Sequence, residues 1–186
     1  MSITTLDPNT ALVVIDLQKG IAAMPLVHPI ADVVARAREL LDAFRARELP
    51  VVLVNVTGGA PGRTERPPRT QPFPKDFAEF LPELDQKPSD IVVTKRTWGA
   101  FASTDLEARL RARDVTQVVV IGVATGTGVE STARQAYEAG FNVTLAIDAM
   151  TDARPEAHAY AIANVFPRLG ETGTTRDVIA KLEERS

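Results

Sequence analysis

Cysteine is absent from this chain of 186 residues. Its absence excludes disulfide bonds, thiolate metal sites and a cysteine nucleophile. Histidine is scarce, because His28 and His158 are the only two, which leaves few ligands for a metal ion and few bases for a serine hydrolase. A G-x-S-x-G motif is also missing. The sequence therefore predicts no bound metal and no cofactor, and it disfavours a serine hydrolase.

A strong charge of either sign and a long apolar run are lacking too. The net charge is −3, so neither nucleic acid nor an anionic membrane is a favoured partner. No apolar run approaches the length of a membrane span, and the first residues show no signal-peptide pattern, so we expect a cytoplasmic protein. Length and ordinary globular composition predict a single domain over residues 1–186.

Apolar runs alternate with helical patterns along most of the chain. This alternation with short connections predicts an α/β fold whose mostly parallel sheet carries helices on both faces. The predicted strands are residues 11–15, 51–56, 90–94, 118–121 and 141–147, with a short sixth strand within 165–172. The predicted helices are residues 32–48, 105–113, a helix ending near 138, 152–164 and a last one ending near 184.

Polar side chains follow these strands where each one ends. Asp16, Asn55 and Lys95 stand at or near the carboxyl ends of three strands, and ligands of open α/β sheets bind outside those ends. We therefore expect these side chains to converge on one pocket. Trp98 and Phe101, shortly after Lys95, are candidate walls of that pocket.

The turn after the fourth strand is rich in glycine. Gly126 and Gly128 allow close approach of the backbone, and a helix that starts there directs free N–H groups at an anion or oxyanion. Two alternatives remain at this point. One is an ordinary βα loop, and the other is a dinucleotide site in which Asp148, at the end of the fifth strand, would bind the ribose.

Residues 57–90 are the least regular part of the chain. Seven of the 13 prolines lie there, and Arg63, Arg66 and Arg69 recur every three residues. A proline-stiffened basic loop of this kind can be a lid that binds a substrate carboxylate, or a surface or subunit-contact loop. The sequence leaves both interpretations open.

Four groups of residues carry a family resemblance. They are residues 11–18, Lys95 with 99–106, 122–125 with 131–134, and 148–149. In this order and spacing they resemble the isochorismatase-like hydrolases over nearly the whole chain. The resemblance implies a three-layer α/β/α sandwich around a six-stranded parallel sheet, a cis peptide bond between Val123 and Ala124, and a homo-oligomer. Many members hydrolyse amides with an Asp–Lys–Cys triad, whose first two residues correspond to Asp16 and Lys95.

The chain departs from that triad at Gly128, which occupies the position of the cysteine. Thr127 is no substitute, because a hydroxyl needs an activating base at its own position. Isochorismatases in the strict sense resemble this chain in having glycine there, and they hydrolyse a vinyl ether without a covalent intermediate. We therefore expect such a reaction on a small carboxylate-bearing substrate, with Asp16 as the acid and Ala124, Thr125 and Thr127 in contact with the substrate. The alternatives are a catalytically silent member that binds a small ligand, and an amide hydrolase whose cysteine has been replaced.

Overall fold

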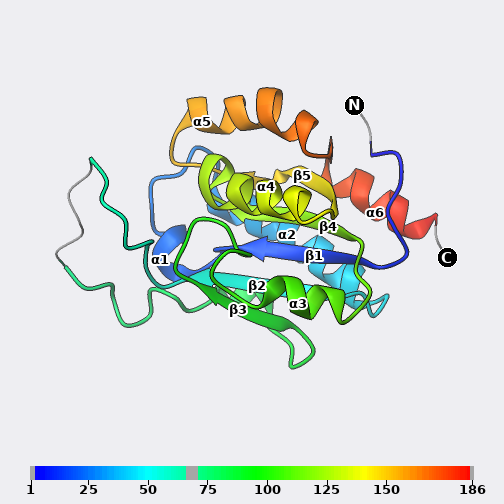
Figure 1. Cartoon of the computed structure of the whole chain (residues 1–186), viewed down its shortest axis with the longest axis horizontal. Helices are drawn as coiled ribbons and strands as arrows, with labels where there is room; N and C mark the ends of the chain where they lie inside the picture. The colour runs from blue at the N-terminus through cyan, green and yellow to red at the C-terminus, as the bar shows by residue number, and fades with distance from the viewer. Residues whose placement is uncertain (1–2, 66–70, 185–186) are drawn as a thin grey trace.

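The computed structural model describes residues 3–65 and 71–184. Six parallel strands form one sheet in the order β3-β2-β1-β4-β5-β6 (Figure 1). The predicted α/β class, the parallel sheet and its six strands are confirmed. The strands are β1 (Thr10–Ile15), β2 (Val51–Val56), β3 (Ile91–Lys95), β4 (Gln117–Val123), β5 (Asn142–Thr151) and β6 (Glu171–Gly173).

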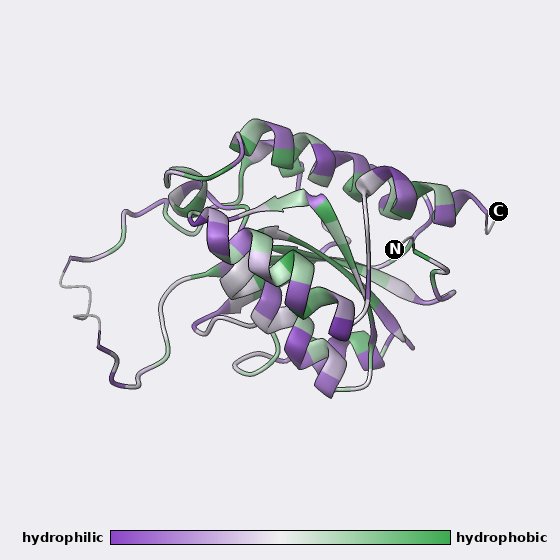
Figure 2. Cartoon of the chain, turned by 90° about the horizontal axis from the view of Figure 1, so that it is seen from above, coloured by the Kyte–Doolittle hydropathy of each residue, from purple (hydrophilic) through white to green (hydrophobic). Residues whose placement is uncertain are grey.

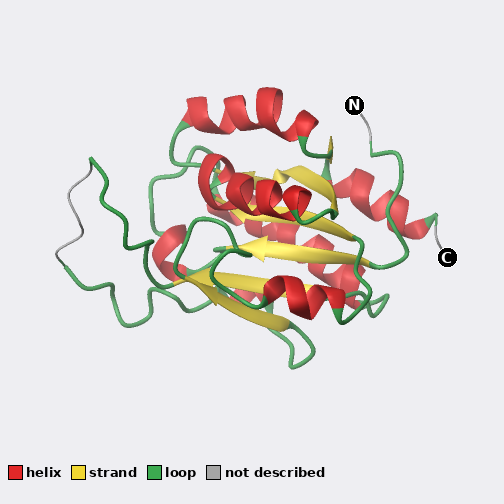
Figure 3. Ribbon diagram, viewed as in Figure 1, coloured by secondary structure: helices red, strands yellow, loops and turns green. Residues whose placement is uncertain are grey.

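Helices cover both faces of the sheet (Figure 3). On one face pack α2 (Ile30–Arg45) and α6 (Thr175–Glu183), together with the short turn η1 (Pro82–Leu84). On the other face pack α3 (Leu106–Arg111), α4 (Glu130–Glu138) and the segment formed by α5 (Pro155–Tyr160), η3 (Ala161–Val165) and η4 (Phe166–Arg168). The apolar sides of the helices face the sheet and their polar sides face outward (Figure 2). These are the three layers of the expected sandwich.

The central strands are buried on both faces. In β1, Val13 and Ile15 pack against the layer that contains α3 and α4, whereas Leu12 and Val14 pack against the layer that contains α2. Alternate side chains of a strand point to opposite faces, so a strand between two helical layers must be apolar at every position. This is why β1 appears in the sequence as an unbroken apolar run.

The predicted end of the fifth strand was wrong. The fifth strand does not end near Asp148 but continues to Thr151, and its register with β4 shifts between Val120 and Gly122. A polar residue inside a strand is tolerated here because the Asp148 carboxylate accepts hydrogen bonds from the backbone N–H and hydroxyl of Thr175. A short helix, α1 (Lys19–Ala22), follows β1 and is not among the helices that the sequence predicted.

The backbone at the end of β1 has an uncommon conformation. Asp16 has a φ of +52°, in the left-handed region that costs energy for a residue with a side chain. In the adjacent strand β4, Gly122 has a φ of +116° and pairs with Ile15, the residue before Asp16. A Cβ atom on Gly122 would lie 2.0 Å from the Ile15 carbonyl oxygen, so only glycine fits. The two strand ends can therefore approach closely beside the candidate site.

The described parts of the irregular 57–81 segment extend away from the sheet beside α1, on the side opposite the two chain ends (Figure 1). The segment returns at residues 77–81, where the Gln18 side chain donates to the Phe77 carbonyl and the Leu81 N–H donates to the Leu17 carbonyl. None of the described helices is long and apolar enough to cross a membrane. The cytoplasmic location stays a prediction.

Candidate active site

A pocket of about 250 Å³ lies at the carboxyl ends of β1 to β4. Among the described residues that line it, Asp16 and Lys95 are the only ionisable ones, and most of the others are apolar. Trp98 stands at its mouth with 69% of its surface exposed. The remaining lining residues are Ile21, Met24, Leu26, Val56, Gly58, Gly59, Thr97, Val123, Ala124, Thr127, Gly128 and Ala153.

Asp16 and Lys95 form a buried ion pair in this pocket. The Lys95 Nζ donates to Asp16 Oδ2 over 2.7 Å and to the Thr97 carbonyl over 3.2 Å. The other carboxylate oxygen, Asp16 Oδ1, is buried and has no hydrogen-bond partner among the described residues. Buried polar atoms are nearly always hydrogen-bonded, so an exception that lines a pocket marks a place for a ligand, a water molecule or a proton.

Burial changes the acidity of Asp16. Removal from water raises the pKa of the Asp16 carboxyl to about 6, although the charge and the hydrogen bond of Lys95 lower it. Desolvation therefore outweighs the ammonium. With a pKa of about 6, roughly a tenth of the molecules carry the proton at pH 7.

The turn after β4 supplies the wall opposite Lys95. The peptide bond between Val123 and Ala124 is cis, as the resemblance implies. The next residues form η2 (Thr125–Val129), a wide helical turn that continues into α4. A Cβ atom on Gly128 would lie 3.4 Å from Asp16 Oδ2, 3.2 Å from the Val123 carbonyl oxygen and 3.0 Å from Ile15. A side chain at position 128 would thus stand directly against the Asp16 carboxylate.

Several N–H groups of the turn already have acceptors. The N–H of Gly126 donates to Asp152 Oδ2 over 2.8 Å, and the N–H groups of Thr127 and Val129 both donate to the Ala124 carbonyl. These groups are not available to an oxyanion. The expected anion site is thereby narrowed to the neighbourhood of Gly128, which lines the pocket.

Three of the predicted site residues do not line the pocket. Asn55 instead donates to the Ala78 carbonyl and fixes the returning 77–81 segment, because its position in β2 points it toward that segment. Phe101 packs against Phe141 in the core, with ring centroids 5.8 Å apart. Thr125 is fully buried and is bonded to His158. The other predicted residues, including Trp98, Ala124 and Thr127, do line it.

The arginines of the basic loop are not placed at the pocket. Arg63 is exposed and does not line the pocket, whereas Arg66 and Arg69 lie outside the described residues.

The dinucleotide interpretation is contradicted, because Asp148 lies within β5 and its carboxylate is bonded to Thr175 of α6 in the other helical layer. A ribose-binding acid would have to stand at a strand end beside the glycine-rich turn.

Sequence reasoning missed the residues that form the mouth of the pocket. Met24 and Leu26 come from the segment after α1, and Ala153 follows β5. Their only signal in the sequence was their position shortly after the carboxyl ends of strands, where binding loops of α/β folds occur. No group of three or more His, Asp or Glu side chains in the described chain is arranged to hold a metal ion.

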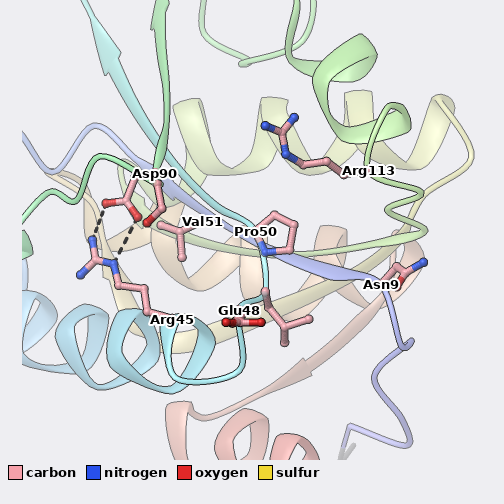
Figure 4. A pocket seen from close by; sticks show the side chains of 9 residues that line it. Asn9, Arg45, Glu48, Pro50, Val51, Asp90 and Arg113 are labelled. Atoms are coloured by element: carbon pink, nitrogen blue, oxygen red, sulfur yellow. Dashed lines mark hydrogen bonds and ion pairs between the residues drawn. The ribbon is translucent and has the colours of Figure 1, made fainter.

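A larger cavity of about 750 Å³ lies at the amino ends of the strands, at the other end of the sheet from the pocket (Figure 4). It is formed around Asn9, Pro50 and Asp90, which precede β1, β2 and β3. Its polar centre is the Arg45–Asp90 ion pair, in which both carboxylate oxygens accept hydrogen bonds. Its position at the amino ends of the strands and its satisfied ion pair distinguish it from the pocket at Asp16.

Comparison with known proteins agrees with this geometry. The chain matches the isochorismatase domain over residues 10–177. It is 38% identical to the isochorismatase family protein YwoC of Bacillus subtilis, over 94% of this chain and 95% of that protein. It is 32% identical to the ureidoacrylate amidohydrolase RutB of Methylobacterium radiotolerans, over 86% of this chain and 74% of that protein.

A solved structure is also similar along its whole length. An isochorismatase family protein from Burkholderia thailandensis superposes with a TM-score of 0.93 at 44% sequence identity, and the match covers 98% of this chain and all of that one. The family model spans most of the chain, and two of the relatives are well above 30% identity over nearly their full length. The chain belongs to the isochorismatase family of hydrolases.

Proposed function

We propose that the protein hydrolyses a vinyl ether, or a closely related enol-type bond, in a small carboxylate-bearing substrate, with Asp16 as the group that handles the proton. The observation that carries this proposal is the buried and unpartnered Asp16 Oδ1 in a pocket that lacks a nucleophile at Gly128. A carboxyl with a pKa of about 6 can carry a proton to a substrate near neutral pH.

The reaction requires one water molecule and no covalent bond to the protein. Protonated Asp16 donates its proton to the terminal carbon of the enol ether, and the ether carbon becomes an oxocarbenium ion. Water adds to that carbon and returns a proton to Asp16. The resulting hemiketal breaks its bond to the departing oxygen, which takes a proton and leaves as an alcohol while a ketone remains. All atoms balance with one water consumed, and Asp16 ends as it began.

Lys95 has two tasks in this proposal. Its bond to Asp16 Oδ2 fixes the carboxyl group, so that Oδ1 is the oxygen presented to the substrate. Two of its three N–H groups are engaged by Asp16 and Thr97 in the described chain, and the third suits a substrate carboxylate. The proposal includes substrate contacts by Ala124, Thr127 and Trp98, which line the same pocket.

The size and lining of the pocket favour a small, largely apolar substrate. A volume of about 250 Å³ is at the lower end of what ligand pockets usually offer. Lys95 is the only cation among the lining residues that the structure describes, and it is already paired with Asp16. The pocket therefore suits a substrate with one carboxylate better than one with two.

The second candidate function is ligand binding without turnover. The position of Gly128 favours this function, because a side chain there would stand beside Asp16, where the nucleophile of a triad belongs. Glycine supplies no nucleophile at that position. A family member that had lost its nucleophile would keep the pocket and the ion pair. Amide hydrolysis through a cysteine is excluded for this chain as written.

We also propose that the protein forms a homo-oligomer, a dimer or larger. Apolar side chains are exposed around the pocket mouth, among them Met24, Val27 and Trp98. Exposed apolar groups gathered at one place are typical of contact surfaces. Light scattering at micromolar concentration tests this proposal, and a monomeric mass would contradict it.

The experiment that tests the proposed reaction is a panel of vinyl ethers, amides and imides, each with and without a carboxylate, incubated with the purified protein. Hydrolysis of a carboxylate-bearing vinyl ether that disappears in Asp16→Asn supports the proposal. Because Trp98 is the single tryptophan and stands at the pocket mouth, its fluorescence reports binding independently of turnover. Binding without hydrolysis of any compound would favour the silent relative.

A further inference from the structure

A second polar cluster lies beside the pocket and takes no part in the proposed chemistry. It contains the two histidines of the chain, His28 from the segment before α2 and His158 from α5. Their ring centroids are 4.7 Å apart, with the planes tilted by 59°. The His158 Nδ1 is 2.8 Å from the Thr125 hydroxyl, and the His28 Nδ1 is 3.1 Å from the Thr151 hydroxyl. No pattern in the sequence indicated that His28 belongs to a cluster.

The cluster connects three segments that form the pocket. His28 follows Met24 and Leu26 of the mouth by a few residues, and Thr125 lies between the lining residues Ala124 and Thr127. The third segment is the end of β5, which contributes Thr151. The histidine rings meet where these segments come together.

Asp152 strengthens the same junction from the end of β5. Its carboxylate accepts from the N–H of Gly126 in the turn and from the N–H of Arg154. Its carbonyl accepts from the N–H of Val27, next to His28. Asp152 is itself buried and is followed by Ala153 of the pocket wall. The bonds to Gly126 and Val27 thus join Asp152 to two segments that are distant from it in the sequence.

The Thr125–His158 contact does not form a second catalytic centre. Thr125 is fully buried and does not line the pocket, so no substrate reaches its hydroxyl. The Asp152 carboxylate is bonded to backbone N–H groups and no described bond joins it to either ring, so the chain lacks the third member of a triad here. The geometry fits a positioning role instead.

Electrostatics make the contact between the rings sensitive to protonation. Burial, followed by the nearby charge of His28, lowers the pKa of His158, and the Asp152 carboxylate opposes this effect. In the described chain, His28 and Asp152 are the charged groups that act on His158 from the neighbouring segments. The turn itself contacts His158 through the uncharged hydroxyl of Thr125. Two imidazolium rings 4.7 Å apart would repel each other.

We propose that His28 and His158 are positioning residues that fasten the mouth segment and the end of β5 to the turn at Thr125, and that the pocket keeps its shape only while at least one of the two rings is neutral. The inference rests on the proposed function only for the statement that a substrate enters this pocket. It predicts that acid opens the mouth through the histidines, separately from any titration of Asp16.

The test follows the two histidines and the single tryptophan in the whole chain. Proton NMR of the imidazoles gives two resonances that His28→Gln and His158→Asn assign. We expect His158 to titrate below the ordinary value of about 6.5 and to titrate at a higher pH in His28→Gln, because a like charge has been removed. Equal, ordinary midpoints that neither replacement moves would overturn the proposal.

Trp98 fluorescence then reports the pocket mouth. The measurement is made in Asp16→Asn, so that the Asp16 carboxyl contributes nothing to the pH dependence and catalysis is not needed. We expect the emission to change as the pH falls through the midpoint of His158. In Asp16→Asn with His158→Asn the change should vanish, since asparagine keeps a group near Nδ1 that bonds Thr125 but does not titrate.

A third variant separates positioning from mere bulk. His158→Leu keeps apolar volume but removes the bond to Thr125, so we expect altered Trp98 emission at every pH, which His158→Asn restores. An unchanged pH response in His158→Asn, with a melting temperature like that of the parent, would overturn the proposal. Because these readouts need no turnover, the proposed hydrolysis can fail while this inference stands, and the reverse.

Discussion

A buried ion pair, Lys95–Asp16, and a partly buried one, Arg45–Asp90, lie at opposite ends of the sheet's strands and are nearly equal in length, at 2.7 and 2.6 Å. Their carboxylates differ. Both oxygens of Asp90 accept from Arg45, and Oδ2 also accepts from the N–H of Lys87. Asp16 has one oxygen bonded to Lys95 and one with no partner in the described chain. A satisfied pair supports structure, whereas a half-satisfied one keeps bonding capacity for a ligand.

The cavities around the two pairs are also unequal, and the smaller one is the better candidate site. The cavity near Asp90 has about three times the volume of the pocket at Asp16. Cavity volume alone would have selected the amino ends of the strands as the candidate site. The unpaired oxygen, the raised pKa and the carboxyl ends of the strands all select the pocket at Asp16.

The strongest way to test this contrast is to neutralise each carboxylate in turn. Asp16→Asn keeps the size of the side chain but removes the proton, so we expect kcat on the best substrate to fall by about 10²–10⁴ with a modest change in KM. Asp90→Asn is the matched control and should leave kcat unchanged while it lowers the melting temperature. Wild-type kcat in Asp16→Asn would refute the proposed role of Asp16.

Removing each cation should separate the pairs by stability. In Arg45→Met the Asp90 carboxylate loses its partly buried partner, and we expect a loss of about 1–3 kcal/mol in the free energy of unfolding. In Lys95→Met the loss should be smaller, because Asp16, with a pKa already near 6, takes up a proton and becomes neutral. Urea denaturation at pH 7 measures both. Equal losses in the free energy of unfolding would mean that Asp16 stays ionised when Lys95 is removed.

The pH dependence of kcat/KM also tests the role of Asp16. If protonated Asp16 is the acid, kcat/KM should be level below about pH 6 and fall tenfold per pH unit above it. Lys95 lowers the Asp16 pKa, so Lys95→Met should move this fall to higher pH, and Arg45→Met should not move it. A rate that instead rises through pH 6 would make Asp16 a base.

Stability should respond to Asp16 with a defined sign. Its folded pKa of about 6 lies above the ordinary 3.8, so the folded state binds more protons between these values. The unfavourable contribution of Asp16 therefore develops as the pH rises from 3.8 to 6. His158, whose pKa is lowered, contributes stability above 6.5 that is lost as the pH falls through its folded value. Urea titrations of Asp16→Asn and His158→Asn across this range should show opposite changes relative to the parent.

The smallest expected effect comes from adding a thiol. Gly128→Cys places sulfur beside Asp16 and Lys95, although Ile15 and the Val123 carbonyl must move by a few tenths of an ångström. We expect roughly tenfold faster alkylation by chloroacetamide than in Gly59→Cys, because one unit of pKa depression gives ten times more thiolate. Gly59 lies on the same pocket with open space around it. No other cysteine competes for the label, and equal rates would show that position 128 does not activate a thiol.

Local patterns in the sequence determined most of the fold. Unbroken apolar runs predicted β1 and β4, and a run interrupted only by Asn55 predicted β2, because strands buried on both faces are apolar at nearly every position. The glycine-rich turn and the residues that end β1 and β3 were placed at one edge by the same logic. The absence of cysteine excluded thiol chemistry without any structure. The site residues themselves stay a proposal, because only experiment tests them.

Contacts between distant segments decided the rest. Asn55 and Phe101 are near Asp16 in the predicted order of elements, but their side chains point to the 77–81 segment and to the core, which no local pattern encodes. Asp148 continues its strand because Thr175 of α6, 27 residues later, satisfies its carboxylate. His28 and His158 meet only in three dimensions. The balance of burial against the Lys95 charge, which sets the acidity of Asp16, depends on packing and could not be read from the sequence.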